Sequence, residues 1–504
     1  MYNSFYFRYL VEIFSASVPT NTIFRVVLPS QVNAFESGLL NALSVVRAEI
    51  ARAIFVSYCR MKFPQVSFLK SNSRVSGKSN LKDRISSSTR SGQLPDLFPE
   101  YVYLGRSLHS AFCDLSGSSM SSTPIAAQTN KLRQLIEDFE NNYLCISEEL
   151  SKENWDSVVF FNGRNPDQAG IREASECKSI AWLSLEHGSR PGQSFHFENF
   201  QTQDRISFQK RVSDCRLKLS DEDVAEITTW SKLWLTNQRS SSSQNDFLRN
   251  GSTENRIKSI PIRPIVPIYT SSLDETLSET QWSTIDYEIL VSRTVEVSLK
   301  IAKFSYTPLV IVHPNALKRS WGDLVYLVKR LRAHNIGYVL PWEQTSPYSF
   351  LQNAPFVVSW RSTISVEASA DGIPSFLLAD SIFDLVADVR ILDFPLNSSS
   401  LSEWEVDPFG SYLYIYYFFN NGYQVTDNTH SLFREIPLRR IERLIPLGSK
   451  WLSLKKRLNL VKYFFYLKKS SPVEEGAFLR SLHRHSSVEG KLTKKLKRYS
   501  DQVK

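Results

Sequence analysis

Apolar and polar positions along the first half of this chain repeat with two different periods. Short runs rich in Val, Ile, Leu and Phe, each bounded by polar or turn-forming residues, predict buried strands. Longer stretches with apolar residues three or four positions apart predict helices. The predicted strands are residues 23–29, 52–58, 157–161 and 180–185, and the predicted helices are residues 31–46, 130–153 and 167–177.

The same alternation resumes in the second half of the chain. Strands that alternate with helices predict a mostly parallel sheet with helices on both faces. We therefore expect an α/β protein with two tandem Rossmann-like, doubly wound domains that face a cleft. In this half the predicted strands are residues 265–270, 309–314, 336–341, 356–360 and 375–379, and the predicted helices are residues 278–304, 317–334, 348–352 and a helix that begins near residue 363.

A polar stretch at residues 236–256 separates the two halves. Because 504 residues are too many for one hydrophobic core, we place a domain boundary there. Two serine-rich segments in the first domain hold few large apolar residues, so we expect mobile loops at residues 71–92 and 116–124. The predicted parts are an N-terminal domain at residues 1–250, a C-terminal domain at residues 251–449 and a tail at residues 450–504.

The basic character of the chain is concentrated in the tail. The formal net charge is +9, and residues 450–504 hold 15 Lys and Arg against 4 Asp and Glu, so the rest is close to neutral. Apolar and aromatic residues alternate with Lys there, which is typical of a helix on an anionic membrane surface and equally of an ordinary surface helix with a solvated end. No recognition motif accompanies the charge, so we expect no nucleic-acid partner.

The N-terminal stretch and the cysteines indicate a cytoplasmic protein, peripheral on the inner face of the membrane if the tail binds there. Arg8 and Glu12 interrupt the apolar opening, so it does not resemble a secretory signal. No run approaches the roughly 18 apolar residues of a membrane-spanning helix. The five cysteines are scattered, without the close spacing of zinc or redox sites.

Polar residues follow three predicted strands of the second domain. Ser362 and Thr363 stand where a helix begins, and Glu367 lies one turn further on the same face. Backbone N–H groups there hold phosphates in many α/β proteins, and a carboxylate beside them binds ribose hydroxyls. Simple N-capping with a solvated Glu367 is the alternative. His313, which ends the strand at 309–314, can donate to a phosphate or a leaving oxygen, although a lone His is more often structural.

Other candidates lie at the remaining strand ends. Pro314 and Asn315 follow His313, and Ser271 and Ser272 follow the first strand of the second domain. In the first domain, the candidates that would face the cleft from the other side are Asn162, Gly163, Arg164, Glu186, His187 and Gly188. Glu186 is a candidate general base toward a sugar hydroxyl, or else the ion-pair partner of Arg190.

One acidic cluster has a simpler interpretation. Residues 221–223 are Asp-Glu-Asp, a spacing used to bind a metal with a sugar nucleotide. Ser220 stands three residues before Asp223, however, which is the pattern of a helix N-cap with acids in the first turn. The chain also has no P-loop and no Gly-x-Gly-x-x-Gly after a strand, which disfavours nucleotide hydrolysis and dinucleotide redox chemistry.

Taken together, four segments resemble the bacterial capsule and surface-polysaccharide biosynthesis glycosyltransferases of the GT-B fold. The likeness spans residues 157–379, with a weaker one at residues 24–43. The segments are VVFFNGRNPDQAGIREA, YTSSLDE, LVIVHPN and VVSWRSTISVEASADGIPSFL.

Single positions both match and depart from the family's motifs. Ser362, Thr363 and Glu367 match the Ser-Thr and Glu of its last strand–helix unit, and Ile373 replaces Lys between the matching Gly and Pro. His313 and Pro314 match its His-Pro pair, and Ile311 stands where an Arg is often found. The Glu-His-Gly at residues 186–188 resembles an acidic-acidic-Gly motif, with His at the centre.

The resemblance implies a transferase that moves a sugar from a nucleotide-sugar donor to a surface polysaccharide or lipid-linked acceptor. It assigns the diphosphate to Ser362 and Thr363, the ribose to Glu367, and a phosphate or the leaving group to His313. Glu186 would be the base on the acceptor side. No metal and no cofactor beyond the donor is expected. A polyol phosphate transferase of the CDP-glycerol type and a non-catalytic binding or assembly protein on the same scaffold are the alternatives.

Overall fold

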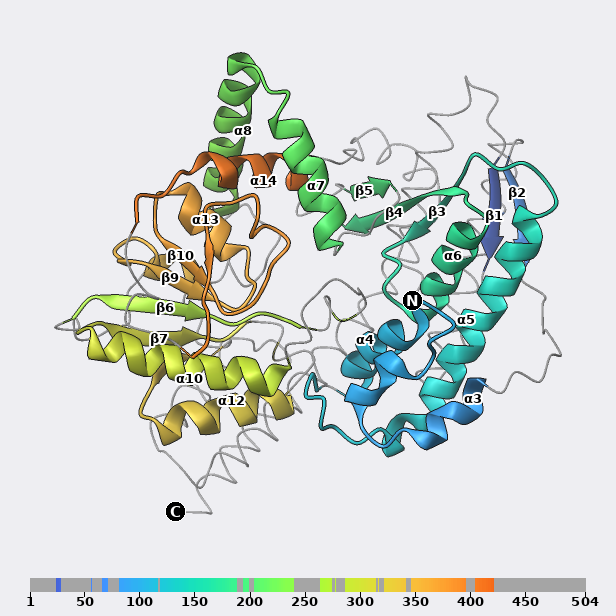
Figure 1. Cartoon of the computed structure of the whole chain (residues 1–504), viewed down its shortest axis with the longest axis horizontal. Coiled ribbons are helices and arrows are strands. Elements are labelled where there is room, and N and C mark those ends of the chain that lie inside the picture. The colour runs from blue at the N-terminus through green and yellow to red at the C-terminus, as the bar shows by residue number, and fades with distance from the viewer. Residues whose placement is uncertain are drawn as a thin grey trace, which may run out of the picture.

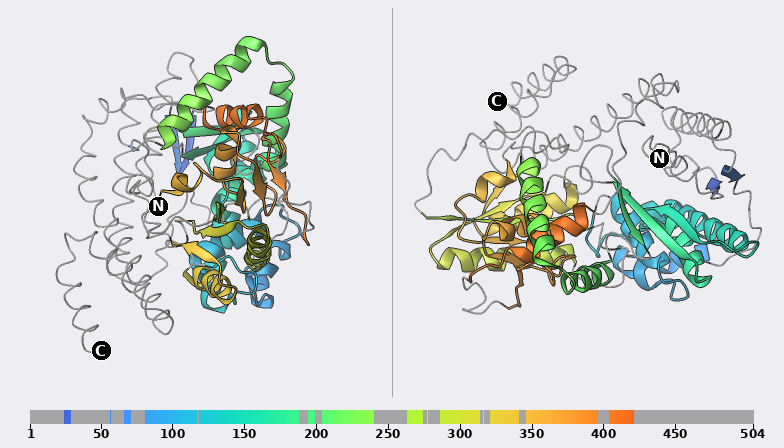
Figure 2. Two further views of the ribbon diagram at one scale, coloured as in Figure 1. Left: turned by 90° about the vertical axis from the view of Figure 1, so that its left-hand side faces the viewer. Right: turned by 90° about the horizontal axis from the view of Figure 1, so that it is seen from above.

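The protein has two halves, seen side by side in Figures 1 and 2. The first holds β1–β5 and α3–α6, and the second is built on β6–β11. This computed structural model describes residues 24–28, 56, 66–70, 81–116, 118–187, 194–198, 204–239, 263–273, 277, 286–313, 316, 321–340, 346–395 and 404–420. The tail at residues 450–504 and the helix expected at residues 31–46 lie outside these ranges.

The second half contains a six-stranded, fully parallel sheet with the strand order β11-β10-β9-β6-β7-β8. In chain order this is the 3-2-1-4-5-6 arrangement of a Rossmann fold. The α/β class with parallel sheets is therefore confirmed, and this half is one doubly wound unit. Its strands are β6 (Ile265–Tyr269), β7 (Thr307–Ile311), β8 (Gly337–Val339), β9 (Val357–Ser359), β10 (Ser375–Leu377) and β11 (Arg390–Ile391).

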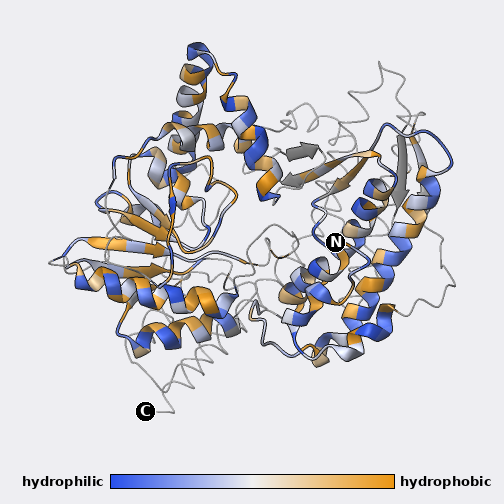
Figure 3. Ribbon diagram, viewed as in Figure 1, coloured by the Kyte–Doolittle hydropathy of each residue, from blue (hydrophilic) through white to orange (hydrophobic). Residues whose placement is uncertain are grey.

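Helices cover both faces of this sheet because successive strand residues point to opposite sides. On one face, alternate residues such as Ile268 and Val358 pack against α10 (Tyr287–Lys303) and α12 (Trp321–Ala333). On the other face, Tyr269 and Val357 pack against α13 (Ile364–Ala370). Figure 3 shows the apolar colour on the strands and on the inner sides of these helices.

Three more helices extend this half. The helices α7 (Arg205–Arg216) and α8 (Asp221–Arg239) form one hydrophobic core with α14 (Phe409–Phe419) and residues near β10. Trp234, for example, stacks on Phe419 at 4.2 Å between ring centroids. Both α7 and α8 precede the boundary predicted at residue 250, yet their apolar faces are buried by the second half. These two helices therefore come before the predicted boundary in the sequence but belong to the hydrophobic core of the second half.

The first half is built on a helical core. Within the described residues its helices are α3 (Leu81–Arg84), α4 (Leu104–Ser116), α5 (Thr129–Leu150) and α6 (Pro166–Cys177). Its strands form two separate sheets: β1 (Phe24–Leu28) pairs with β2 (Val66–Lys70), and β3 (Ser157–Phe161) pairs with β4 (Ala181–His187), which pairs with β5 (Ser194–Glu198).

The second Rossmann-like domain expected in this half therefore remains a prediction. The β3–β4 pair is parallel, but the β4–β5 pair is antiparallel, with Glu186 opposite Phe195, in a sheet that we expected to be mostly parallel. Only six residues separate His187, the last residue of β4, from Ser194, the first residue of β5, and neighbouring parallel strands need a crossover connection of about a dozen residues or more.

The two serine-rich segments differ from the expected mobile loops. In the first, residues 71–80 lie outside the described ranges, residues 81–87 form short helical turns, a further turn begins at Ser91, and Ile85 is 1% exposed. In the second, Ser118 donates a hydrogen bond to Asp323 Oδ1 at 2.7 Å, and the Ser119 amide donates to Asp323 Oδ2 at 2.7 Å. Hydrogen bonds from a hydroxyl and a backbone amide therefore connect this segment of the first half to α12 of the second half.

No helix in the described ranges is long and apolar enough to cross a membrane.

Candidate functional site

The candidate site lies where β6 and β9 are neighbours in the C-terminal sheet. The chain continues from β6 toward β7 on one side and from β9 toward β10 on the other. The connections therefore diverge at the carboxyl ends of the two strands, and ligands bind at such switch points in open α/β sheets. The loop after β6 carries Ser271, and the segment after β9 carries Arg361 and Ser362. In Figure 1 the loop after β6 extends toward the first half.

Backbone contacts fix these loops to one another. The Trp360 amide donates to the Tyr269 carbonyl at 2.9 Å, and the Arg361 amide donates to Ser271 Oγ at 3.2 Å. On the other side of β6, the His313 amide donates to Thr270 Oγ1 at 2.8 Å. The sheet thus brings Ser271, His313 and Ser362, predicted as donor-binding residues, to a single edge. We call Ser271, His313, Arg361, Ser362 and Asp380 the switch-point cluster.

The start of α13 differs in detail from the predicted hydroxyl cap. Thr363 is the N-cap residue, but its side chain makes no capping hydrogen bond. The turn is held instead by the buried Ser359 and Ser365 hydroxyls, which lie 2.7 Å apart, and the Ser362 amide donates to Ser359 Oγ at 3.2 Å. The inner Ser359 and Ser365 thus hold the turn, whereas Ser362 is half-buried and Thr363 is exposed.

Arg361 is a member of the cluster that we did not single out in the sequence. Its guanidinium donates to Asp380 Oδ1 at 2.9 Å, and its side chain is 5% exposed. Burial lowers the pKa of Arg361, and the Asp380 charge opposes that shift. The sequence signal that could have identified Arg361 was its position, because it is a charged residue directly after a predicted buried strand.

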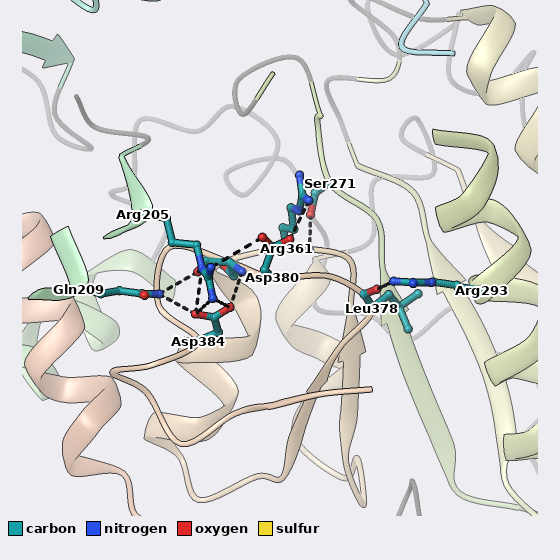
Figure 4. Close-up of polar contacts among 9 residues, drawn as sticks. Arg205, Gln209, Ser271, Arg293, Arg361, Leu378, Asp380 and Asp384 are labelled. Carbon is teal, nitrogen blue, oxygen red and sulfur yellow. Dashed lines mark hydrogen bonds and ion pairs between the residues drawn. The ribbon is translucent and has the colours of Figure 1, made fainter. Parts of the chain in front are cut away.

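A second ion pair continues from Asp380, as Figure 4 shows. Arg205, the first residue of α7, donates to both carboxylate oxygens of Asp384, with its Nη2 at 2.9 Å and 2.7 Å. The Arg205 Nη1 lies 3.8 Å from Asp380 Oδ2, and Gln209 Nε2 donates to Asp384 Oδ1 at 2.6 Å. The loop after β10 is therefore fastened both to α7 and to Arg361, and the two Arg and two Asp charges balance.

Glu367 lies on α13 and is buried, with 5% of its surface exposed. Burial raises the pKa of this carboxyl to about 7, while a hydrogen bond with Tyr348 and the charge of Arg239 act in the opposite direction. Tyr348 belongs to η5 (Pro347–Phe350), a turn of 3-10 helix where we expected a short helix. A ribose would therefore reach Glu367 only after Tyr348 moves.

The remaining donor-side residues are placed in part. His313 and Ser272 are half-buried, whereas Pro314 and Asn315 lie outside the described residues. In the first half, the Asn162 amide donates to the Leu185 carbonyl at 2.7 Å, next to Glu186. The β3–β4 pairing thus brings two predicted acceptor-side segments to one sheet edge.

The loop at residues 162–164 has a strained start. Asn162 and Gly163 have φ values of 58° and 68°, in the left-handed region. The Arg164 guanidinium lies 3.5 Å from Asp114, which directs it toward α4. Glu186 and His187 lie inside β4 rather than after it, and Gly188 is outside the described residues.

The acidic cluster at the start of α8 is a helix cap, as predicted. The Ser220 amide donates to Asp223 Oδ2 at 2.8 Å, and the Asp223 amide donates to Ser220 Oγ at 3.2 Å. The hydrogen bonds that the Ser220 hydroxyl and amide donate to this carboxylate lower the pKa of Asp223. In the described part of the chain, no group of three or more His, Cys, Asp or Glu side chains could hold a metal ion.

Comparison with known proteins finds structural neighbours only. A scan against protein-family models finds no match, and a search of curated proteins also finds none. Among solved structures, KpsC of Thermosulfurimonas dismutans, a β-Kdo 2,4 transferase, is similar at 11% identity and a TM-score of 0.33, over 52% of this chain and 80% of that one. S. aureus MnaA with UDP is similar at 9% identity and a TM-score of 0.25, over 60% and 81%.

A third neighbour is the UDP-GlcNAc 2-epimerase of Methanocaldococcus jannaschii in complex with UDP-GlcNAc and UDP. It has 12% identity and a TM-score of 0.23, over 63% of this chain and 81% of that one. The chemistry of this chain's own residues therefore decides which function to propose.

Proposed function

We propose that this protein is a glycosyltransferase that binds a nucleotide-sugar donor at the switch-point cluster and transfers the sugar to a glycan or lipid-linked acceptor. The observation that carries the proposal is the convergence of Ser271, His313, Arg361 and Ser362 at the carboxyl ends of β6, β7 and β9. Hydroxyls, an imidazole and a guanidinium are the donors that recognise phosphate oxygens, and this edge of an open α/β sheet is where nucleotides bind.

The chemistry asked of these residues is charge stabilisation. Transfer leaves a nucleoside diphosphate with new negative charge, and prearranged donors at that position lower the barrier. Arg361 would exchange its contact with Asp380 for one with a phosphate, so its guanidinium stays paired throughout. His313 would donate to the leaving oxygen, and Glu186 would take the proton of the acceptor hydroxyl.

We propose that Glu367 contacts the ribose only when Tyr348 has moved away from it. The hydroxyl of Tyr348 and the ribose hydroxyls compete for the same carboxylate, so donor binding would move Tyr348 away. Burial raises the pKa of Glu367 to about 7, so this carboxyl keeps its proton to a higher pH than an exposed Glu does.

A thermal-shift screen of the purified protein against UDP, CMP, CDP, GDP and dTDP tests the proposal. A ligand that binds only the folded state stabilises it by about 2.7 kcal/mol at a hundredfold excess over its dissociation constant. We expect one nucleotide to raise the melting temperature of wild type and of Ser292→Ala, an exposed serine on α10, but less that of Ser362→Ala. No shift with any of the five would favour the non-catalytic alternative.

A product assay separates sugar transfer from polyol phosphate transfer. The purified protein is incubated with nucleotide sugars and with CDP-glycerol, and release of free nucleotide is measured. Turnover of a nucleotide sugar, reduced in His313→Ala, supports the proposal. Turnover of CDP-glycerol alone would contradict it and favour the alternative transferase.

A further inference from the structure

A cavity lies at the end of α13 that is away from the switch-point cluster. This helix runs from the switch-point cluster back to Asp371 and Gly372, which precede β10 and so lie at the amino edge of the sheet. The cavity there has a volume of about 570 Å³ and opens between α8, the end of α13 and the start of α14. Pockets of roughly 300–1,000 Å³ hold small organic molecules. This cavity is large enough for a ligand and is separate from the proposed donor site.

The charges around the cavity leave one cation without a counter-charge. Arg239 is paired with Asp371, with Nη2 at 2.8 Å from Oδ2. Lys232 is exposed and makes no ion pair with any described residue; its ammonium lies 5.6 Å from the centre of the Tyr412 ring. The three charged side chains of the cavity therefore carry a net positive charge at Lys232, which favours an anionic ligand.

The polar and apolar parts of the lining are on different elements. Lys232, Thr236 and Arg239 are spaced four and three residues apart on α8, so they share one helix face. The opposite wall contains Ala370, Val406, Pro408 and the Tyr412 ring. At Gly372, φ is +77° and an added Cβ would meet nothing within 4 Å, so the wall there is bare backbone beside open space.

We propose that this cavity binds a small organic anion, with its phosphate or carboxylate on the Lys232 ammonium and its apolar body against Tyr412 and Pro408. A cation on a flexible stem beside an aromatic ring suits such a ligand, because the ring covers the apolar part while the ammonium binds the charge. The proposal does not rest on the proposed function, because Lys232, Tyr412 and Pro408 lie outside the switch-point cluster. Arg239 lies between the two places, since it lines this cavity and also donates to the Glu367 carbonyl.

Calorimetric titration with phenyl phosphate tests the site, with inorganic phosphate and benzyl alcohol as probes that lack one half of the ligand. We expect phenyl phosphate to bind most tightly of the three. Lys232→Ala should weaken its binding about tenfold or more, because hydrogen bonds to charged groups are worth about 1.5–3 kcal/mol. Lys232→Arg should keep most of the affinity, and Lys232→Glu should abolish binding.

The matched control is Lys210→Ala, which removes an exposed lysine on α7 outside the cavity lining. It should bind phenyl phosphate as wild type does. Equal affinity in wild type and Lys232→Ala would overturn the proposal, as would no measurable binding in wild type. Inorganic phosphate that binds as tightly as phenyl phosphate would overturn the assignment of an apolar body.

Discussion

The hydroxyl of Tyr348 is hydrogen-bonded to the carboxylate of Glu367 in the interior of the second half. Arg239 stands over the same tyrosine, with its guanidinium 5.6 Å from the ring centre, and donates to the Glu367 carbonyl at 3.2 Å. Glu367, which the sequence resemblance assigns to the ribose, is therefore already hydrogen-bonded to the side chain of Tyr348. Binding of a nucleotide at this position requires an exchange of partners.

Tyr348→Phe tests this exchange. Without the hydroxyl, the free protein has no hydrogen bond for the ribose to replace, so we expect nucleotide affinity to rise. A net hydrogen bond is worth about 0.5–1.5 kcal/mol, which corresponds to roughly a two- to tenfold lower dissociation constant. The measurement is nucleotide titration of wild type and variant. Weaker binding by the variant would contradict the exchange and indicate that the hydroxyl itself contacts the nucleotide.

Glu367→Gln tests the cost of burying the charge. The pKa of Glu367 is raised from 4.5 to about 7 by burial, so its contribution to folding is present below about pH 4.5 and is lost as pH rises through about 7. This amounts to about 3 kcal/mol. We expect the variant to lose less stability than wild type between pH 5 and pH 8, as measured by urea unfolding.

The control for this pH dependence is Glu222→Gln, because Glu222 is an exposed carboxyl on α8. Its unfolding free energy should follow that of wild type at every pH. If Glu367→Gln also follows wild type, the carboxyl is ionised in the folded protein at pH 5 and the argument fails.

Arg361→Ala should both destabilise the protein and weaken nucleotide binding. Removing one partner of a buried ion pair costs up to about 3–5 kcal/mol, and we expect a smaller loss here because Arg205 Nη1 still lies 3.8 Å from Asp380 Oδ2. Adding Asp380→Asn removes the carboxylate that has lost its Arg361 partner, so the double variant should recover part of the stability but not the nucleotide affinity. Urea unfolding and nucleotide titration of both single variants and the double variant give two double-mutant cycles, one for stability and one for nucleotide affinity. Recovery of affinity in the double variant would mean that Arg361 acts only structurally.

Ser118→Ala should loosen the contact between the two halves. Ser118 donates to the buried Asp323, whose pKa is raised to about 6 by burial and lowered by this bond, so the variant should raise that pKa further. A lost bond to a buried acceptor costs about 1–3 kcal/mol. Ser122→Ala is the matched control, because its bond to Glu288 is exposed. Equal stability of the two variants would show that the contact contributes little.

Local patterns sufficed to predict the second half of the fold. Residues 265–269, 307–311 and 357–359 are apolar runs bounded by polar residues, and they form β6, β7 and β9 close to the predicted bounds. The parallel sheet follows from their alternation with helices. The convergence of Ser271, His313 and Ser362 also follows, since parallel strands end at one edge.

Contacts between distant segments could not be predicted in this way. Arg205 and Asp384 are 179 residues apart, and no local sequence pattern around either residue predicts their contact. The burial of Glu367 depends on Tyr348, 19 residues upstream, which reaches it only after the sheet has formed. The antiparallel β5 was missed because the chain between residues 187 and 194 lacks the Asn-Gly or Asp-Gly signature of a tight hairpin.

The packing of α7 and α8 against α14 determines where the chain can be cut. A fragment that begins at residue 251 would lack Phe208, Val212 and Trp234, and would leave the aromatic face of α14 without its cover. Large uncovered apolar patches promote aggregation. A fragment that begins before Asp204, the N-cap residue of α7, retains these helices. Independent expression of the C-terminal half therefore requires a start nearly fifty residues earlier than the polar linker suggests.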